Sequence, residues 1–288
     1  MSFYRNAVWF VKGVQEYTKD SNVLIFLLSC ATRPPTSFST LGVVHTIVRN
    51  LHFLSNFSHG INVHIHIVDM SSARQVWAFA QSFSENNQLH VLINNAGCMV
   101  NQRELTEEGL EKNFATNTLG TYILTTALIP ALKKVEDPRV ITVSSGGMLT
   151  QKLNVSDLQF EKGSFDGTMA YAQNKRQQVI LTERWASQHK EIHFSSMHPG
   201  WADTPAVQSS MPSFHAKMQS KLRTEAMGAD TVVWLAVSAA AIKQPSGLFF
   251  QDRKPVATHL PLAYSRGSPQ DEEQLLTALE EFAQKFKP

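Results

Sequence analysis

The sequence predicts an α/β protein in which a doubly wound, mostly parallel sheet is covered by helices on both faces. From residue 61 onward, short runs of branched apolar residues alternate with stretches that have the helical period. Such alternation is typical of parallel strands joined by helical crossovers. We expect a single domain over residues 1–288, with an atypical segment at 1–60, a core at 61–250, and a loop and helix at 251–288.

The composition excludes several classes of protein. Of the 288 residues, 43% are hydrophobic and 17% are charged, which is typical of globular proteins and unlike collagen, disulfide scaffolds or disordered chains. The net charge of +2 is too balanced for a nucleic-acid-binding surface, so we expect no nucleic-acid partner. The two cysteines, Cys30 and Cys98, have no metal-site spacing. We therefore expect no metal site and an intracellular location.

The chain contains no apolar run long enough to form a transmembrane helix. Such a helix needs roughly 18 apolar residues, and the longest run near the start is Val23–Leu28. The segment Tyr4–Tyr17 has an imperfect amphipathic pattern. It fits either an ordinary surface helix or a helix that makes peripheral contact with a membrane.

The strands of the predicted sheet are short apolar runs bounded by turn residues. Asn94–Gly97 and Asp137-Pro138 are turns of this kind. The predicted strands cover Ile61–Val68, Leu89–Ile93, Arg139–Val143, Ile192–Met197 and Ser246–Phe250.

Helices are predicted between and after these strands. Met70–Ser72 supplies a cap for the first, Thr106 caps the second, and acidic and basic residues complement the dipole of the last. The predicted helices run from Ser72 to Phe83, from Thr106 through Gly120 to Lys134, and over Gly167–Gln188, Thr224–Ala240 and Gln270–Lys287.

Tyr171 and Lys175 are the first candidates for chemistry. They lie four residues apart on the predicted helix 167–188, so both project from one face. A phenol with an ordinary pKa near ~10 is a poor proton donor or acceptor at neutral pH, and an adjacent ammonium would lower that pKa. The bare pattern also occurs in many surface helices, where it is a solvated pair.

Small polar residues follow two of the predicted strands. Ser144 and Ser145 come after the strand 139–143, and Asn94–Gly97 follows the strand 89–93. The carboxyl ends of parallel strands form the edge where ligands bind in open α/β sheets. A serine there can donate a hydrogen bond to a substrate carbonyl, although many such residues only cap helices or form turns.

Several motifs occur together in one order. These are Asn-Asn-Ala-Gly (94–97), Asn117, Val-Ser-Ser (143–145), Tyr-x-x-x-Lys (171–175) and His-Pro-Gly (198–200). Over residues 62–250 the chain resembles the short-chain dehydrogenase/reductase family. The resemblance implies a Rossmann-like fold and an oxidoreductase that transfers hydride between NAD or NADP and a small-molecule carbonyl or alcohol. It also implies a possible homo-oligomer through the long helices.

The resemblance assigns catalytic roles to four residues. Tyr171 matches the tyrosine that exchanges a proton with the substrate, and Lys175 the lysine that lowers its pKa and binds the nicotinamide ribose. Ser145, rather than Ser144, matches the serine that orients the carbonyl. Asn117 matches the helix asparagine that holds a water in a proton relay to the lysine.

Further residues are implied in cofactor binding. Asp69 resembles the acid that meets the adenine amino group, and Asn95 and Gly97 match residues on the adenosine side. The resemblance places Pro199, Gly200 and Thr204 at the nicotinamide amide. Trp201, Met148 and Met211 could either line an apolar substrate pocket or belong to the core.

The start of the chain departs from the family pattern. The family has Thr-Gly-x-x-x-Gly-x-Gly after its first strand, where glycines let the backbone approach pyrophosphate at a helix N-terminus. Gly13, Gly42 and Gly60 lack that spacing, and Ser29–Pro35 replaces the loop with prolines that donate no hydrogen bond. We therefore expect an incomplete or irregular first βαβ unit. An alternative function follows, namely an inactive variant or a binding scaffold.

Overall fold

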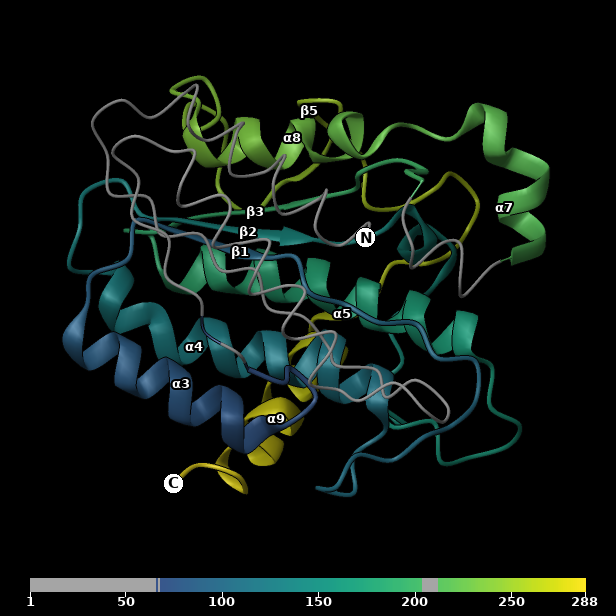
Figure 1. Cartoon of the computed structure of the whole chain (residues 1–288), viewed down its shortest axis with the longest axis horizontal. Helices are drawn as coiled ribbons and strands as arrows, with labels where there is room; N and C mark the ends of the chain where they lie inside the picture. The colour runs from purple at the N-terminus through teal and green to yellow at the C-terminus, as the bar shows by residue number, and fades with distance from the viewer. Residues whose placement is uncertain (1–65, 67, 204–211) are drawn as a thin grey trace.

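The computed structural model describes residues 66, 68–203 and 212–288, and its centre is a five-stranded sheet (Figure 1). The strands are β1 (Val91–Asn94), β2 (Arg139–Val143), β3 (His193–Met197), β4 (Phe249–Gln251) and β5 (Lys254–Pro255), in this spatial order. The first four pair in parallel, and β5 returns antiparallel to β4. The predicted α/β, Rossmann-like fold is confirmed.

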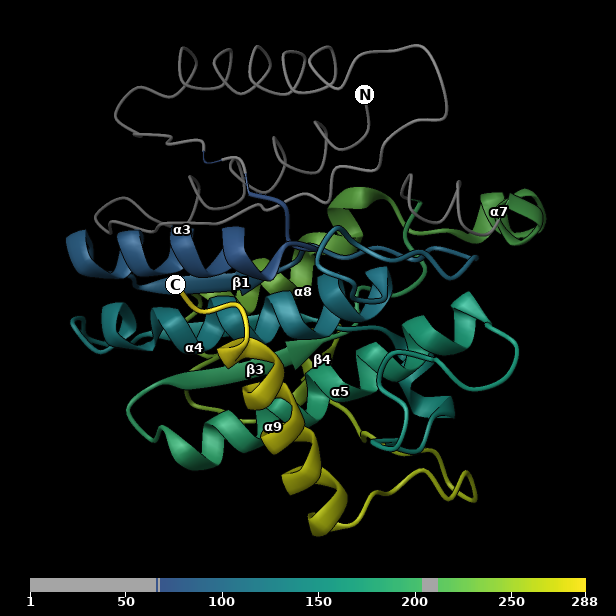
Figure 2. The ribbon, with the colours of Figure 1, turned by 90° about the horizontal axis from the view of Figure 1, so that it is seen from below.

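Helices cover both faces of the sheet (Figures 1 and 2). On one face lie α4 (Gly120–Leu132) and α5 (Gly167–Gln188), with α3 (Ala73–Asn86) packed beside α4. On the other face, α8 (Glu225–Val237) contacts β1, β2 and β3. This arrangement follows from the crossover rule, because each parallel strand must be reached by a helix that packs back onto the sheet.

The period of two along each strand divides the core into two layers. In β1, Leu92 packs into the cluster under α4 and α5, whereas Val91 and Ile93 pack into the cluster under α8. Adjacent side chains on a strand point to opposite faces, so a continuous apolar run serves both layers. The buried strands therefore need the unbroken apolar runs that the sequence shows.

Short helical segments complete the described fold. The π-helix η1 (Phe114–Leu119) leads directly into α4, and the 3₁₀ helix η2 (Gly146–Thr150) follows β2. The helix α7 (Pro212–Met218) and the turn η3 (Gln219–Lys221) lie between β3 and α8 and were not predicted.

Of the two predicted helix caps, the one before α3 is confirmed and the one at Thr106 is wrong. The side chain of Ser72 caps α3 and that of Thr224 caps α8 by accepting from backbone N–H groups. Thr106 instead accepts from the N–H groups of a preceding turn. The Glu111 carboxylate accepts from the first N–H groups of the helix leading into η1, because it lies at the true start of that helix.

The C-terminal helix α9 (Pro269–Gln284) begins at a capping box formed by Ser268 and Asp271, and its first turn is acidic, as predicted. It ends at Gln284, so the lysines at 285 and 287 lie beyond its last turn, contrary to expectation.

Several sequence predictions lie outside the described residues. The amphipathic helix at 4–17 and the irregular segment at 20–60 belong to this group. Of the strand predicted at 61–68, only His66 and Val68 are described, and neither is assigned to a strand. The single-domain organisation stays a prediction.

Helix α9 covers part of the surface of α4 and α5 (Figure 2). Leu275 and Leu279 are fully buried, and the Tyr122 hydroxyl on α4 donates to the Glu280 carboxylate at 2.7 Å. The Trp77 indole N–H on α3 donates to the carbonyl of Ala283 at 2.9 Å.

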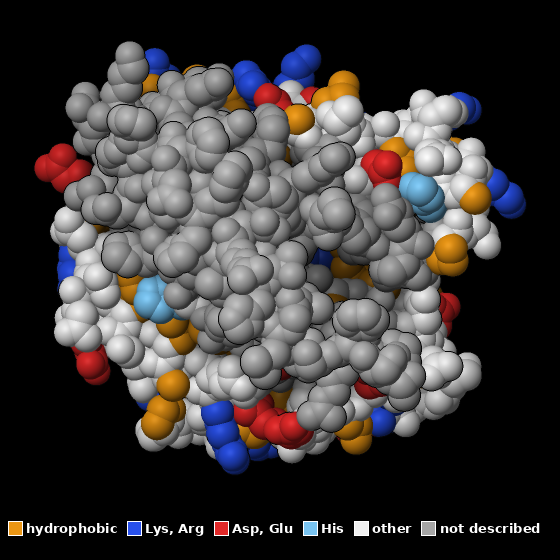
Figure 3. Space-filling view, viewed as in Figure 1, with side chains coloured by type: hydrophobic (Ala, Val, Ile, Leu, Met, Phe, Trp, Pro, Cys, Tyr) orange, Lys and Arg blue, Asp and Glu red, His pale blue; other side chains and the backbone are white. Residues whose placement is uncertain are grey.

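The described surface mixes charges of both signs. On the face shown in Figure 3, blue and red side chains are interspersed around the rim of the described region. Within the described residues, no helix is both long and apolar enough to cross a bilayer.

The packing of α5 against α9 predicts a pH dependence of stability. Burial, reinforced by the nearby Glu272 carboxylate, raises the pKa of Glu183 to about 7. The folded state thus holds this proton more tightly than the unfolded state does, so stability falls as the pH rises from about 4.5 through 7. We expect Glu183→Gln to remove this loss, on the order of 1–2 kcal/mol after allowance for partial exposure.

Urea unfolding of both proteins at pH 5 and pH 8 measures the effect. The matched control is Glu85→Gln at an exposed position on α3. An equal loss of stability between the two pH values in the parent chain and in Glu183→Gln would contradict the assignment.

Candidate functional site

Three turns of the chain meet at the carboxyl edge of the sheet. Asn94 is the last residue of β1 and is followed by Asn95–Gly97. Ser144 and Ser145 follow β2, and His198–Gly200 follows β3. In the register, Asn94 pairs with Thr142 and Val143 with Met197, so these strands end side by side. The prediction that the three turns share one edge is confirmed.

Helix α5 is fastened to the end of β2 through one residue, Lys175. The Ser144 hydroxyl donates to the main-chain carbonyl of Lys175 at 2.8 Å, and Lys175 Nζ donates to the carbonyl of Val143 at 3.0 Å. The Asp166 side chain caps the start of α5. Because the helix is held at this point, its two candidate residues face the edge where the turns meet.

Tyr171 lies one helical turn before Lys175 and close to Ser145. Burial raises the pKa of Tyr171 to about 12, and the nearby Ser145 hydroxyl opposes this shift. The structure therefore does not show the lowering of the Tyr171 pKa by Lys175 that was expected. The reason is geometric, since Lys175 Nζ lies 5.4 Å from the centre of the Tyr171 ring and bonds elsewhere.

Lys175 is itself almost completely enclosed, with 3% of its surface exposed. Burial lowers its pKa to about 8, and the nearby Cys98 opposes this shift. The ammonium form therefore still dominates at pH 7, by roughly tenfold.

Asn117 joins the η1 π-helix to the turn after β1. Its side-chain oxygen accepts from the Cys98 N–H at 2.9 Å, and its amide donates to the Cys98 carbonyl at 2.8 Å. Its own carbonyl accepts from Gln178 Nε2 at 2.6 Å, and Lys175 Nζ donates to Gln178 Oε1 at 3.0 Å. The resemblance implies a water between Asn117 and Lys175, whereas the structure connects them through the side chain of Gln178.

Sequence reasoning missed the group that supports the Ser145 loop. His198 Nδ1 accepts from the Gly146 N–H at 2.9 Å, directly after Ser145. Burial and the nearby Arg223 lower the pKa of His198 to about 4, so the ring is neutral and can accept. In the sequence, the feature that could have pointed to His198 is its position directly before Pro199 at the end of a predicted strand.

The turn after β3 is packed against Arg223. Gly200 has φ of 77°, and a Cβ there would lie 2.6 Å from the Arg223 guanidinium. The guanidinium donates to the Pro199 carbonyl at 3.3 Å and to both oxygens of Asp252 at 2.6 and 2.9 Å. Thr204, the remaining residue expected in this turn, lies outside the described residues.

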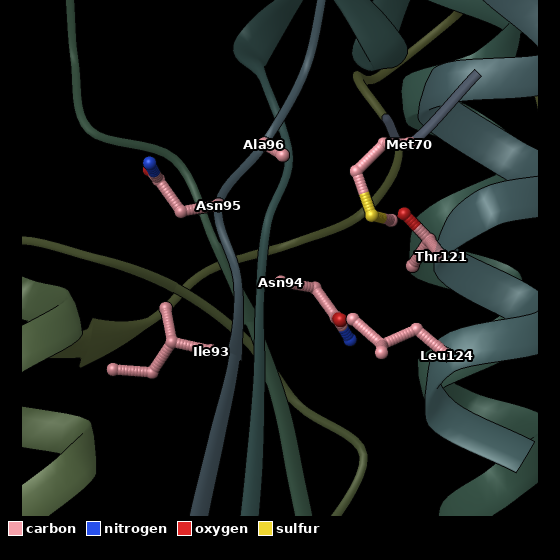
Figure 4. A pocket seen from close by; sticks show the side chains of 7 residues that line it. All are labelled: Met70, Ile93, Asn94, Asn95, Ala96, Thr121 and Leu124. Carbon is pink, nitrogen blue, oxygen red and sulfur yellow. The ribbon is translucent and has the colours of Figure 1, made fainter. Parts of the chain in front are cut away.

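A hollow lies at the end of β1 (Figure 4). Asp69 stands before α3 near this hollow, and its carboxylate accepts from the N–H and the hydroxyl of Ser71, both at 2.8 Å. The residues that line the hollow are Met70, Ile93, Asn94, Asn95, Ala96, Thr121 and Leu124.

The described residues leave room for a nicotinamide dinucleotide beside Lys175. A Cβ on Gly97 would lie 3.4 Å from Lys175 Nζ and 3.1 Å from Asn117 Oδ1, so the glycine leaves space next to the ammonium. The site for pyrophosphate depends on the chain before residue 61, whose sequence lacks the family's glycines.

The structure describes two of the three residues that were expected either to line an apolar pocket or to belong to the core. Met148 is fully buried against Val179 and Phe249, so it belongs to the core rather than to a pocket. Trp201 is 45% exposed, and Met211 lies outside the described residues. Among the residues that the structure describes, no group of three or more His, Cys, Asp or Glu could hold a metal ion.

Comparison with known proteins identifies the family. The model of the family described as short chain dehydrogenase matches residues 49–213. This chain belongs to the short-chain dehydrogenase family. It is 56% identical to the human protein "Dehydrogenase/reductase SDR family member 12" and 54% identical to its bovine counterpart, each over the whole of both chains.

More distant relatives match about two thirds of this chain. Human "Retinol dehydrogenase 12" is 34% identical over 65% of this chain and 60% of its own. Among solved structures, a short chain dehydrogenase from Salmonella enterica matches with a TM-score of 0.57 and 18% identity, over 78% of this chain and 83% of its own. A Pseudomonas aeruginosa RhlG/NADP complex matches with a TM-score of 0.55 and 18% identity, over 72% and 80%. These structures support the fold of this short-chain dehydrogenase family member.

The two bonds from Asn117 to the Cys98 backbone predict a structural cost. We expect Asn117→Ala to destabilise the protein by about 2–4 kcal/mol, because a buried N–H and a buried carbonyl lose their partners. Urea unfolding measures this loss, with Asn86→Ala on the exposed end of α3 as the control. A loss under about 1 kcal/mol would show that the turn after β1 does not depend on these bonds.

Proposed function

We propose that the chain is an oxidoreductase that transfers hydride between NAD or NADP and a small carbonyl or alcohol substrate. The observation that carries the proposal is the placement of Tyr171 beside Ser145, with the enclosed Lys175 ammonium 5.4 Å from the centre of the Tyr171 ring. The names of the retinol dehydrogenase relatives support an alcohol and carbonyl pair as substrate and product.

In this proposal, Tyr171 and Ser145 act on the substrate oxygen. At neutral pH Tyr171 keeps its proton, because its pKa is about 12, so its hydroxyl can donate to a carbonyl oxygen that gains negative charge. Ser145 donates a second hydrogen bond to the same oxygen and orients it. Lys175 supplies positive charge near the phenol, which favours loss of the phenol proton as the substrate oxygen takes it up.

The cofactor, when bound, accepts or delivers the hydride. Lys175 would hold the ribose hydroxyls next to the nicotinamide, and Pro199, Gly200 and Thr204 would contact the nicotinamide amide. Asp69, Asn95 and Gly97 would line the adenosine end. A homo-oligomer, an intracellular location and peripheral membrane contact remain predictions.

One observation favours a second function. Residues 20–60 carry Pro34 and Pro35 and no Thr-Gly-x-x-x-Gly-x-Gly, so the backbone donors that hold pyrophosphate are missing from the sequence. A chain without them would be an inactive variant or a binding scaffold that retains the catalytic half of the fold.

The proton-transfer role of Tyr171 is tested by removing its hydroxyl. We expect Tyr171→Phe to lower kcat about 10²–10⁴-fold, the range that general acid–base catalysis supplies. The assay follows NADH or NADPH oxidation with a panel of aldehydes and ketones that includes retinal. Tyr264→Phe, at a position that is 86% exposed, is the matched control and should keep full activity. Comparable activity in the parent and Tyr171→Phe would remove Tyr171 from the mechanism.

Cofactor affinity separates the two functions. We expect the unaltered chain to bind NADH and NADPH weakly, because several backbone–phosphate hydrogen bonds of about 1.5–3 kcal/mol each are missing. Calorimetric titration measures the Kd, and a chimera in which a Thr-Gly-x-x-x-Gly-x-Gly unit replaces residues 20–60 should recover affinity. Micromolar binding by the unaltered chain would show that this loop is dispensable, and no recovery in the chimera would favour the scaffold.

A further inference from the structure

A single side chain, Gln178, links the Lys175 ammonium to the π-helix that precedes α4. Its Oε1 accepts from Lys175 Nζ at 3.0 Å, and its Nε2 donates to the main-chain carbonyl of Asn117 at 2.6 Å. Gln178 and Asn117 are completely buried and Lys175 is 3% exposed. The amide therefore fills the space between the ammonium and the carbonyl.

The helical spacing and the chemistry of the amide explain this arrangement. Gln178 lies three residues after Lys175 on α5, so the two side chains share a face. A carboxamide offers an acceptor at one end and donors at the other, which is what a bridge from an ammonium to a carbonyl requires. A carboxylate would repel the Asn117 carbonyl, and an apolar side chain would leave both groups without this partner.

We propose that Gln178 is a positioning residue for Lys175, which holds the ammonium against the end of β2 and takes the place of a relay water on the α4 side. This proposal rests on the proposed function for its catalytic consequence, but its geometry does not depend on it. Two of the three N–H bonds of Lys175 then point to Val143 and Gln178. The third is left for the side where Gly97 has no side chain.

The amide also affects where protons can travel. A water molecule between Lys175 and Asn117 could donate and accept protons in turn, whereas a carboxamide nitrogen keeps its hydrogens at neutral pH. Proton exchange at Lys175 would then be confined to its open side. The titratable groups nearest this ammonium are the Tyr171 phenol on the same helix and the Cys98 thiol on the segment after β1.

The pKa of Lys175 itself tests the proposal without substrate or cofactor. Full-length protein labelled with ¹³Cε-lysine would be titrated by NMR between pH 6 and pH 11, and Lys175→Met would assign the resonance. We expect Gln178→Leu to lower the pKa of Lys175 by at least about one unit, because the ammonium loses one of its two acceptors while burial is kept. We expect Gln178→Glu to raise it, because a carboxylate would lie next to the ammonium.

Gln177→Leu is the matched control. Gln177 is the neighbouring buried glutamine and accepts from Thr118 in the same π-helix at 2.7 Å, but it bonds to Thr118 and Asn174 rather than to Lys175. Its loss should leave the pKa of Lys175 unchanged. If Gln178→Leu does not fold, the opposite shift expected for Gln178→Glu still decides the matter. A pKa that moves by less than about 0.3 units in both Gln178 variants would overturn the proposal.

A crystal structure of Gln178→Ala tests the second half of the proposal. We expect an ordered water bonded to both Lys175 Nζ and the Asn117 carbonyl in the space that the amide vacates, since a buried water needs such polar partners. A dry or collapsed space would overturn the claim that the amide stands in for a water.

These measurements separate this proposal from the proposed function. Shifted pKa values in a chain that turns over no substrate would uphold the role of Gln178 and refute the oxidoreductase. If turnover depends on Tyr171 but the pKa of Lys175 is unchanged in both Gln178 variants, the oxidoreductase is upheld and the role of Gln178 is refuted.

Discussion

The attachment of α5 to the carboxyl end of β2 is the constraint on which the site depends. Lys175 takes part through both its main chain and its side chain, with the Ser144 hydroxyl on its carbonyl and its own ammonium on the Val143 carbonyl. A helix that is fixed at one residue in this way has a fixed rotation about its axis. Tyr171, one turn earlier, is therefore placed beside Ser145, where its side chain is partly buried.

In α5, a run of polar residues is buried all around the helix. The six residues from Gln173 to Gln178 are all nearly inaccessible, although none of them is apolar. Each polar group left without a partner in such a place would cost about 1–3 kcal/mol, so this run is tolerable only because its side chains are bonded. Arg176 donates to the carbonyl of Met148 at 2.8 Å, and Gln173 to that of Lys152 at 2.7 Å. The same bonds hold the chain after Ser145 in place. The hydrogen bonds that compensate for burying these polar groups therefore also shape the site.

The sequence predicted the elements whose signals are local and failed where the partner is distant. The predicted bounds of β2 and α5 agree with the structure because an apolar run between turns and a helix that begins after Asp166 are readable within a few residues. Gln178, by contrast, bonds to a carbonyl 61 residues away, and His198 to an N–H 52 residues away. Rules based on helix or strand spacing concern residues close in the sequence, so they cannot predict such distant pairs. The prediction that Thr106 caps a helix was wrong for another reason. Glu111, five residues later, can also accept hydrogen bonds from the N–H groups of a helix start, and only the path of the chain decides which of the two residues lies there.

Burial raises the pKa of Tyr171 and lowers that of Lys175, and only the shift at Lys175 brings a group close to titrating at neutral pH. The Tyr171 pKa of about 12 leaves a wide margin, so the phenol is protonated throughout the neutral range and is ready to donate. The Lys175 pKa of about 8 leaves only about one unit above pH 7, which corresponds to roughly 1.4 kcal/mol in favour of the charged form. A single hydrogen bond to a charged group is worth about 1.5–3 kcal/mol, as much as that margin or more. The hydrogen bonds to the Val143 carbonyl and the Gln178 amide are therefore comparable in size to the margin that keeps this lysine charged at neutral pH.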